Sequence, residues 1–253
     1  MGRYDEITDA NLQKLLANVR HYYQRSLAVA QRFGGPSLYF HRKAAATAKS
    51  AFLSLEHLEL IYAVLPAWGM HRMGDTKTKV VDFDRFEASI NAVRKELEYV
   101  RGFDLASISS QGLRELLKGP LRMAFDTLSV SVSGARLVAN SKVLHHIVPD
   151  LVPPMDRRYT LLFFYYLREK FRRMSGQREG KIRGPSDLPP IDQHCRMFRD
   201  ICVGVWEVLH APQFEAIDPL AESDEPFNTS LPKVVDNMIM AFVQEDPQDW
   251  PMP

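Results

Sequence analysis

The chain lacks most of the features that would assign it to a specialised class of protein. It has only 2 cysteines among 253 residues, too few for a disulfide framework or a four-thiolate metal or iron–sulfur site. Residues 1–6 turn acidic at once and have no apolar core, so no secretory signal is expected. The longest apolar run, residues 161–167, is far too short to cross a bilayer. We therefore expect a cytoplasmic protein with reduced cysteines and no membrane partner.

The composition that remains is typical of an ordinary folded protein. Hydrophobic residues make up 45% of the chain and charged residues 25%, which excludes disordered, collagen-like and supercharged classes. A chain of this length can bury a sizeable core, either as one domain or as two lobes that share a cleft. We expect a single domain over residues 1–243, followed by an acidic, proline-containing tail over residues 244–253.

The formal net charge of +1 hides a strong segregation of charge along the chain. Residues 101–200 carry 17 Lys and Arg against 10 Asp and Glu, whereas residues 201–253 carry 1 against 10. The near-neutral total therefore excludes a uniformly basic nucleic-acid binder but permits a local electropositive face. The stretch 168–183 has seven Lys and Arg against two Glu. It is either a solvated helix end or a strip that contacts phosphates.

Hydrophobic spacing by threes and fours predicts an all-α fold. The clearest example is residues 82–101, where Asp82 or Asp84 would cap the N-terminus and Gly102 would end the helix. Further helices are expected over residues 12–27, 54–65, 110–118, 120–130, 156–174, 191–209 and 231–243. Cys195 and Cys202 share a face of one of these helices and are expected to be core residues.

The segment 134–160 is the most informative part of the chain. We expect one helix to end near Gly134 or Asn140 and a short helix to run from about Ser141 to Pro149. A proline loop then leads to Asp156 at the start of the next helix. Lys142 would then lie near a helix N-terminus, where the dipole lowers its pKa. Because a free lysine has a pKa of ~10.4, such a lowering would create a nucleophile. Asp156 taken alone is equally well explained as a helix cap.

Residues 141–143 (Ser-Lys-Val) and 152–156 (Val-Pro-Pro-Met-Asp) resemble the active-site segment of helix–hairpin–helix DNA glycosylases. The resemblance covers about 25 of the 253 residues. It implies a two-lobed helical fold with a helix–hairpin–helix element at the central cleft. It also implies that Lys142 attacks the sugar C1′, while Asp156 activates the nucleophile or stabilises the transition state. The blocks 68–74 and 156–160 are similar to uncharacterised bacterial proteins.

The same resemblance implies double-stranded DNA as the partner. The usual Leu-Pro-Gly opening of the hairpin is absent, and Arg158 stands where many family members have histidine. The resemblance implies phosphate contacts at Ala139, Asn140 and Ser141 in the hairpin. We further expect Arg157 and Arg158, and Arg172 and Arg173 of the basic stretch 168–183, to contact DNA. The target is expected to be a modified base, with a hypermodified cytosine of phage DNA, and hence antiviral defence, as one option.

A glycosylase must hold its flipped base between aromatic or apolar side chains. Trp68, His71 and His146 are the candidates for this pocket, although Trp68 could instead close the core below Pro66. His145 and His146 have no Cys, Asp or Glu at ligand spacing, so no metal is expected. No cofactor is expected either, because the chain has neither a phosphate-binding loop motif nor a Gly-x-Gly-x-x-Gly motif.

Two other classes of function are alternatives to a DNA glycosylase. A toxin-type ribonuclease is disfavoured because no arginine has a histidine five to seven positions downstream. A non-catalytic helical module that binds nucleic acid or protein remains the main alternative. In that case Lys142 would be a phosphate contact and Asp156 only a cap.

Overall fold

The computed structural model describes residues 3–70, 79–133, 136–165, 191–222 and 225–245. Over these ranges the chain is mostly α-helical, which confirms the predicted all-α class. The only β-type pairing among them is one isolated antiparallel bridge between Val80 and Ser131. None of the described helices combines the length and the apolarity needed to cross a membrane.

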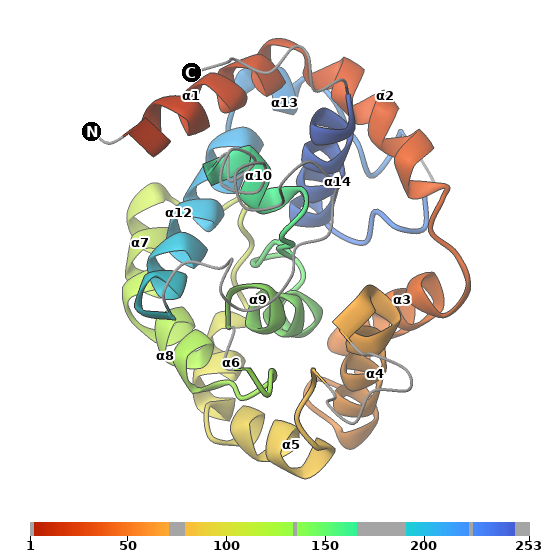
Figure 1. Cartoon of the computed structure of the whole chain (residues 1–253), viewed down its shortest axis with the longest axis vertical. Helices are drawn as coiled ribbons and strands as arrows, with labels where there is room; N and C mark the ends of the chain where they lie inside the picture. The colour runs from red at the N-terminus through yellow and green to blue at the C-terminus, as the bar shows by residue number, and fades with distance from the viewer. Residues whose placement is uncertain (1–2, 71–78, 134–135, 166–190, 223–224, 246–253) are drawn as a thin grey trace, which may run out of the picture.

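Figure 1 shows the order and arrangement of the helices. The first six elements are α1 (Arg3–Ala17), α2 (Val19–Ala30), α3 (Gly35–Ser50), α4 (Leu55–Leu65), the single turn η1 (Pro66–Met70) and α5 (Phe83–Asn91). The middle of the chain forms α6 (Arg94–Val100), α7 (Ser110–Lys118), α8 (Pro120–Thr127), α9 (Arg136–Ile147) and α10 (Thr160–Tyr165). The C-terminal part forms α12 (Ile191–Leu209), α13 (Pro212–Glu215) and α14 (Leu231–Gln244).

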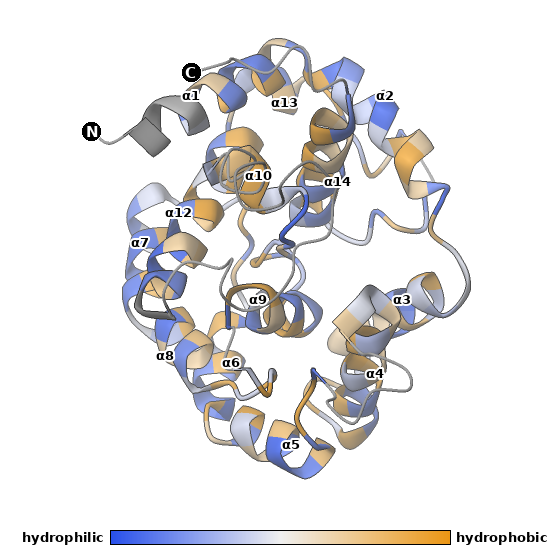
Figure 2. Cartoon of the chain, viewed as in Figure 1, coloured by the Kyte–Doolittle hydropathy of each residue, from blue (hydrophilic) through white to orange (hydrophobic). Residues whose placement is uncertain are grey.

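Helix α9 lies in the middle of the molecule, between the α3–α4 pair and the α8–α12 pair (Figure 1). Every residue from Ala139 to Ile147 is buried, so this part of the helix has no solvent-facing side. A helix that is buried all round carries its polar side chains into the core, where each one needs a partner. The peripheral helices α5 and α8, in contrast, mix polar and apolar residues around their circumference (Figure 2).

Local capping explains several helix starts. Ser54, Asp82, Ser109 and Ser230 each accept a hydrogen bond from a backbone amide three residues ahead. The predicted cap at Asp82 is confirmed, but residues 82–101 form two helices, α5 and α6, separated at Ala92 and Val93. Residues 12–27 are likewise divided, at Asn18, between α1 and α2.

Two further differences from the sequence prediction matter for the site. Helix α3 was not predicted, because its buried face consists largely of alanines and one histidine, a weak apolar pattern. The helix expected from Asp156 begins as α10 at Thr160, and residues 166–190 lie outside the described ranges. Cys202 is buried in the core as predicted, and Cys195 packs partly buried beside it on α12.

Candidate functional site

Of the two expected helix ends, Asn140 is wrong, because residues 136–147 form one continuous helix, and Gly134 lies outside the described residues. Asn140 is 1% exposed and donates hydrogen bonds to the carbonyls of Phe125, at 2.8 Å, and Leu128, at 3.0 Å. These carbonyls lie at the C-terminal end of α8, where helices leave acceptors without an internal partner. Ala139 and Ser141 are also buried inside the helix. The three residues therefore form no phosphate-binding hairpin, and Asn140 instead ties α9 to α8.

Lys142 is a buried amine on this central helix. Lys142 is 8% exposed, and its Nζ donates a hydrogen bond of 3.3 Å to the carbonyl of Trp68. Burial lowers the pKa of Lys142, and the positive charges of Lys233 and Lys79 act in the same direction. The carboxylates of Asp156 and Asp236 raise it. The lowered pKa was expected, but its main cause is burial in mid-helix and not a helix N-terminus.

Asp156 lies in the turn before α10. Its Oδ1 accepts a hydrogen bond of 2.6 Å from the amide of Tyr159, and its own amide donates to Oγ1 of Thr160 at 3.0 Å. Asp156 therefore has the capping role that its position predicted. The carboxylate also acts electrostatically on both Lys142 and Asp236. Lys142 and Asp156 consequently belong to one electrostatic cluster.

Trp68 covers this cluster from the turn η1. Its ring centroid lies 5.5 Å from Nζ of Lys142 and 4.9 Å from the ring of His146. Its Nε1 donates to the carbonyl of Ser37 on α3, at 3.2 Å. Gly69 follows with φ of +81°, a left-handed conformation that glycine adopts without strain and that ends the helical path after α4. Trp68 is thus both part of the packing and part of the predicted pocket.

A buried ion pair on α14 completes the charged part of the site, and the sequence reading missed it. Nζ of Lys233 donates to Oδ2 of Asp236 at 2.6 Å and to Oδ1 of Asn237 at 2.7 Å. It also lies 4.2 Å from the ring centroid of Phe227 and 5.6 Å from that of Trp68. Burial raises the pKa of Asp236, whereas the Lys233 ammonium lowers it. One signal in the sequence was Lys233 and Asp236 in an otherwise apolar helix.

Three buried histidines form a second cluster next to Trp68. His145 and His146 come from α9, and His41 comes from the unpredicted helix α3. Nδ1 of His41 lies 3.0 Å from Nε2 of His146. Desolvation lowers the pKa of all three rings, that of His146 to about 3, so the rings are neutral at pH 7. The expectation that His145 and His146 have no third ligand nearby is wrong, because His41 joins them.

Contacts with the Trp68 ring bring together three of the predicted site residues, Lys142, Trp68 and His146, and the carboxylate of Asp156 acts electrostatically on Lys142. Arg157 and Arg158 follow Asp156 in the same turn, and Arg158 is exposed with its guanidinium 5.5 Å from the Tyr159 ring. His71, Arg172 and Arg173 lie outside the described residues.

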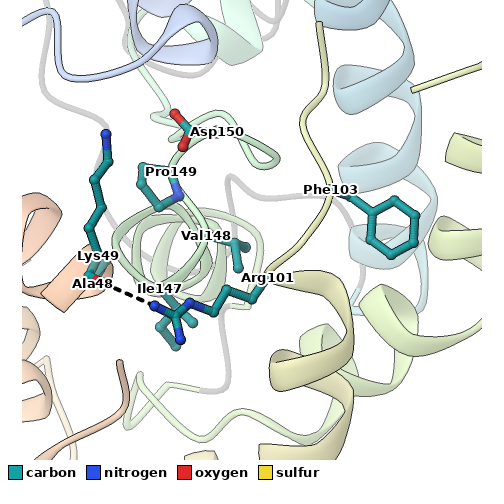
Figure 3. Close-up of a pocket in the computed structure, with 8 residues that line it drawn as sticks. All are labelled: Ala48, Lys49, Arg101, Phe103, Ile147, Val148, Pro149 and Asp150. Atoms are coloured by element: carbon teal, nitrogen blue, oxygen red, sulfur yellow. Dashed lines mark hydrogen bonds between the residues drawn. The ribbon is translucent and has the colours of Figure 1, made fainter. Parts of the chain in front are cut away.

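Two pockets whose linings include Lys and Arg side chains lie near this cluster. The larger, of about 700 Å³, follows α3 and includes Arg42, Lys43 and Lys49, with Thr229 opposite. The smaller, of about 280 Å³, lies at the C-terminal end of α9 (Figure 3). There the Arg101 guanidinium donates to the carbonyl of Lys49 at 3.0 Å. Burial raises the pKa of Asp150 in this pocket, and the charge of Lys49 opposes the shift.

Comparisons of the chain with protein-family models, with curated proteins and with solved structures give no match. The chemistry of the site therefore has to be argued from its own residues. The cluster offers a buried amine, two carboxylates in its field, an aromatic cover and a neutral histidine triad.

Proposed function

We propose that the chain is a DNA N-glycosylase that excises a modified base, with Lys142 as nucleophile and Asp156 as activating carboxylate. The observation that carries the proposal is the buried amine of Lys142, 5.5 Å from the centroid of the Trp68 ring, on which the carboxylate of Asp156 acts electrostatically. These two residues stand 14 positions apart on different elements, and they are the pair that the resemblance to helix–hairpin–helix glycosylases singles out. A buried amine beside a carboxylate suits attack on an electron-poor carbon.

The lysine step needs the neutral amine, which burial of Lys142 favours. Nζ attacks C1′ of the target nucleotide, and the glycosidic C1′–N bond breaks with its electron pair leaving on the base, which takes up a proton. The C1′–O4′ bond then breaks and the C1′–Nζ bond becomes an imine; one proton of the amine goes to the departed base and the other to O4′. Water then hydrolyses the imine and returns free Lys142 and an abasic site.

Asp156 supports this step through its charge. Positive charge develops at C1′ as the base leaves, and a fixed carboxylate stabilises it in a site from which water is largely excluded. Because its Oδ1 is held by the Tyr159 amide, the carboxylate is already oriented before substrate arrives. In a monofunctional variant of the same mechanism, Asp156 activates a water molecule in place of Lys142.

The groove along α3 is the proposed path of the DNA backbone. Arg42, Lys43 and Lys49 line it, and cations on one face suit a polyanion. Arg158 is a second exposed cation next to Asp156. Trp68 offers the aromatic surface that a flipped base requires. A two-lobed arrangement of the helices, a hypermodified cytosine as target and a role in antiviral defence belong to this proposal as expectations.

A binding module without catalysis is the second candidate, and the same groove favours it. Three cations on α3 suffice for a phosphate-binding surface whether or not Lys142 reacts. The two candidates differ in one measurable product, because only the enzyme releases free base.

The test is release of free base, by mass spectrometry, from a panel of duplex oligonucleotides that each carry one modified base. We expect release from at least one duplex, and loss of at least 100-fold in rate for Lys142→Ala or Asp156→Asn. The matched controls are Lys95→Ala and Asp84→Asn, which change exposed residues of α6 and α5.

Borohydride added during turnover should trap Lys142 as a stable secondary amine on the DNA, identified by peptide mapping. Base release without an adduct would favour the Asp156–water route. No base release from any duplex, with binding retained, would favour the binding module. Lys142→Ala and Asp156→Asn variants that both match the parent would overturn the assignment of the site.

A further inference from the structure

The histidine triad has a geometry that its packing alone does not require. The ring centroids of His41, His145 and His146 lie 5.1 to 5.8 Å from one another. One ring nitrogen from each histidine lies within 4.8 Å of the other two. All three residues are 0% exposed. Three neutral imidazoles thus converge on one point in the core.

The outer nitrogen of each ring is held by a hydrogen bond. Nδ1 of His145 donates to the carbonyl of Val152 at 2.8 Å, and Nδ1 of His146 donates to that of Lys142 at 2.7 Å. Because a carbonyl only accepts, these bonds place the proton on Nδ1 and a lone pair on Nε2 in both neutral rings. Nε2 of His41 lies 3.0 Å from Oγ1 of Thr229.

The inner nitrogens face one another. Nδ1 of His41 lies 3.0 Å from the Nε2 lone pair of His146. Nε2 of His145 is buried and has no hydrogen-bond partner among the described residues. Buried polar atoms in native proteins are nearly always partnered, so an unpartnered imidazole lone pair aimed at two other ring nitrogens calls for an explanation.

We propose that His41, His145 and His146 form a three-histidine site for a divalent transition-metal cation of the zinc type. Zinc binds imidazole nitrogen at 2.0–2.1 Å, so tetrahedral ligands lie about 3.3 Å apart. The 3.0 Å pair already matches this spacing, and the remaining separations, at most 4.8 Å, require small ring movements. Three histidines leave a fourth position open, as in catalytic zinc sites.

A hydrogen bond at the outer nitrogen of each ring orients that ring, as a metal site requires. Metal-binding histidines usually donate their other N–H to a carbonyl, carboxylate or hydroxyl, which orients the ring. Val152 and Lys142 supply carbonyls, and Thr229 supplies a hydroxyl. His41 would carry its proton on Nε2, toward Thr229, so that all three ligands stay neutral and binding releases no ligand proton.

The charges around the triad are compatible with a bound cation. Lys233 acts on all three rings, but Asp236 lies 2.6 Å from its Nζ and balances the charge. Thr229 contacts His41 and also lines the groove along α3, so the residue that orients one ligand ring borders a surface pocket. The proposed bond-breaking step uses Lys142 and Asp156 and none of the three ligands, although His146 is also a candidate for the base pocket.

The test is titration of the EDTA-treated full chain with zinc sulfate, followed by calorimetry. We expect one zinc ion per chain and an increase in Tm of roughly 5 °C or more at saturation. His145→Asn keeps a donor at the Nδ1 position and removes the Nε2 ligand, so it should weaken binding by about 100-fold or more. His41→Gln keeps a group at the Nε2 position and should do the same.

Two controls separate the triad from other histidines. His21→Gln changes an exposed histidine beside Glu245 and should leave zinc affinity unchanged. Thr229→Val should weaken binding by 10–100-fold, and Thr229→Ser should restore it. Cobalt should give the visible absorption of a tetrahedral site in the parent chain. A parent chain that binds neither zinc nor cobalt, or folded His145→Asn and His41→Gln variants that bind like the parent, would overturn the proposal.

Discussion

Nζ of Lys142 donates a hydrogen bond of 3.3 Å to the carbonyl of Trp68, a residue 74 positions earlier in the chain. The centroid of the Trp68 ring lies 5.5 Å from the same atom, so Trp68 both accepts the hydrogen bond of the amine and covers it. A buried amine with one neutral acceptor is a costly arrangement, because burial penalises its charged form. An unfavourable contribution of this kind to the free energy of folding is common at functional sites.

Lys142→Met should therefore stabilise the fold while it removes activity. The pKa of Lys142 is lower in the folded state than in the unfolded state, so the unfolded chain binds this proton more tightly. We expect the free energy of unfolding at pH 7 to rise by about 1 kcal/mol. Urea unfolding measures it, with exposed Lys95→Met as control within about 0.5 kcal/mol. A clear loss of stability in Lys142→Met would mean that the lysine is structural.

Mild acid should destabilise the metal-free chain through its buried histidines. Burial lowers the pKa of His41, His145 and His146, that of His146 to about 3. Between about pH 6.5 and pH 3 the unfolded state therefore binds more protons, and stability falls as the pH falls. Each histidine adds a slope of up to about 1.4 kcal/mol per pH unit.

Urea unfolding in EDTA, repeated from pH 7.5 to 5, measures this slope. His146→Asn should flatten it by about one histidine's share, whereas exposed His21→Asn should not. A parent chain with equal stability across this range would contradict the burial of the triad.

Asn140→Ala should destabilise the protein by about 2 kcal/mol. The change removes two buried hydrogen bonds and leaves the carbonyls of Phe125 and Leu128 without their donor. Since Asn140 is 1% exposed, the folded variant should bind DNA as the parent does. Chemical denaturation and fluorescence anisotropy with duplex DNA measure the two effects. Unchanged stability with weakened DNA binding would restore the interpretation of residues 139–141 as phosphate contacts.

Gly204→Ala should cost about 1–3 kcal/mol, because α12 passes very close to α10 at this point. A Cβ built on Gly204 would lie 2.4 Å from Cε1 of Phe164, whose ring is buried and cannot easily move. Thermal unfolding measures the loss. The matched control is Gly102→Ala, where a Cβ meets no atom within 4 Å. Equal Tm values for the two variants would argue against this packing of α12 on α10.

The α3 groove should contribute a salt-dependent part of DNA binding. Lys43→Ala and Arg42→Ala should each weaken binding to any duplex sequence and reduce the slope of log K against log salt by about 0.9. Lys118→Ala on α7, away from the groove, is the control. Salt slopes equal to that of the parent for both groove variants would place the DNA elsewhere.

The sequence alone determined the helical class and most helix positions. Periodic apolar residues and short capping side chains act over a few positions, so Ser54 and Asp82 mark their helix starts without any knowledge of the fold. The same local logic failed for α3, whose buried face is mostly alanine. Pro36, in the first turn after two glycines, was the signal that could have placed it.

Only the tertiary structure decided what surrounds Lys142 and the histidines. Sequence reasoning selected Lys142, Asp156, Trp68 and His146, but burial, and not a helix terminus, lowers the pKa of the lysine. His41, Lys233 and Asp236 join the cluster from helices more than 80 residues away from Lys142 in the chain. Burial and nonlocal contacts depend on how helices pack, which short-range periodicity does not encode. The packing of α3 against α9 brought His41 to His145 and His146, a cluster that no spacing in the sequence indicates.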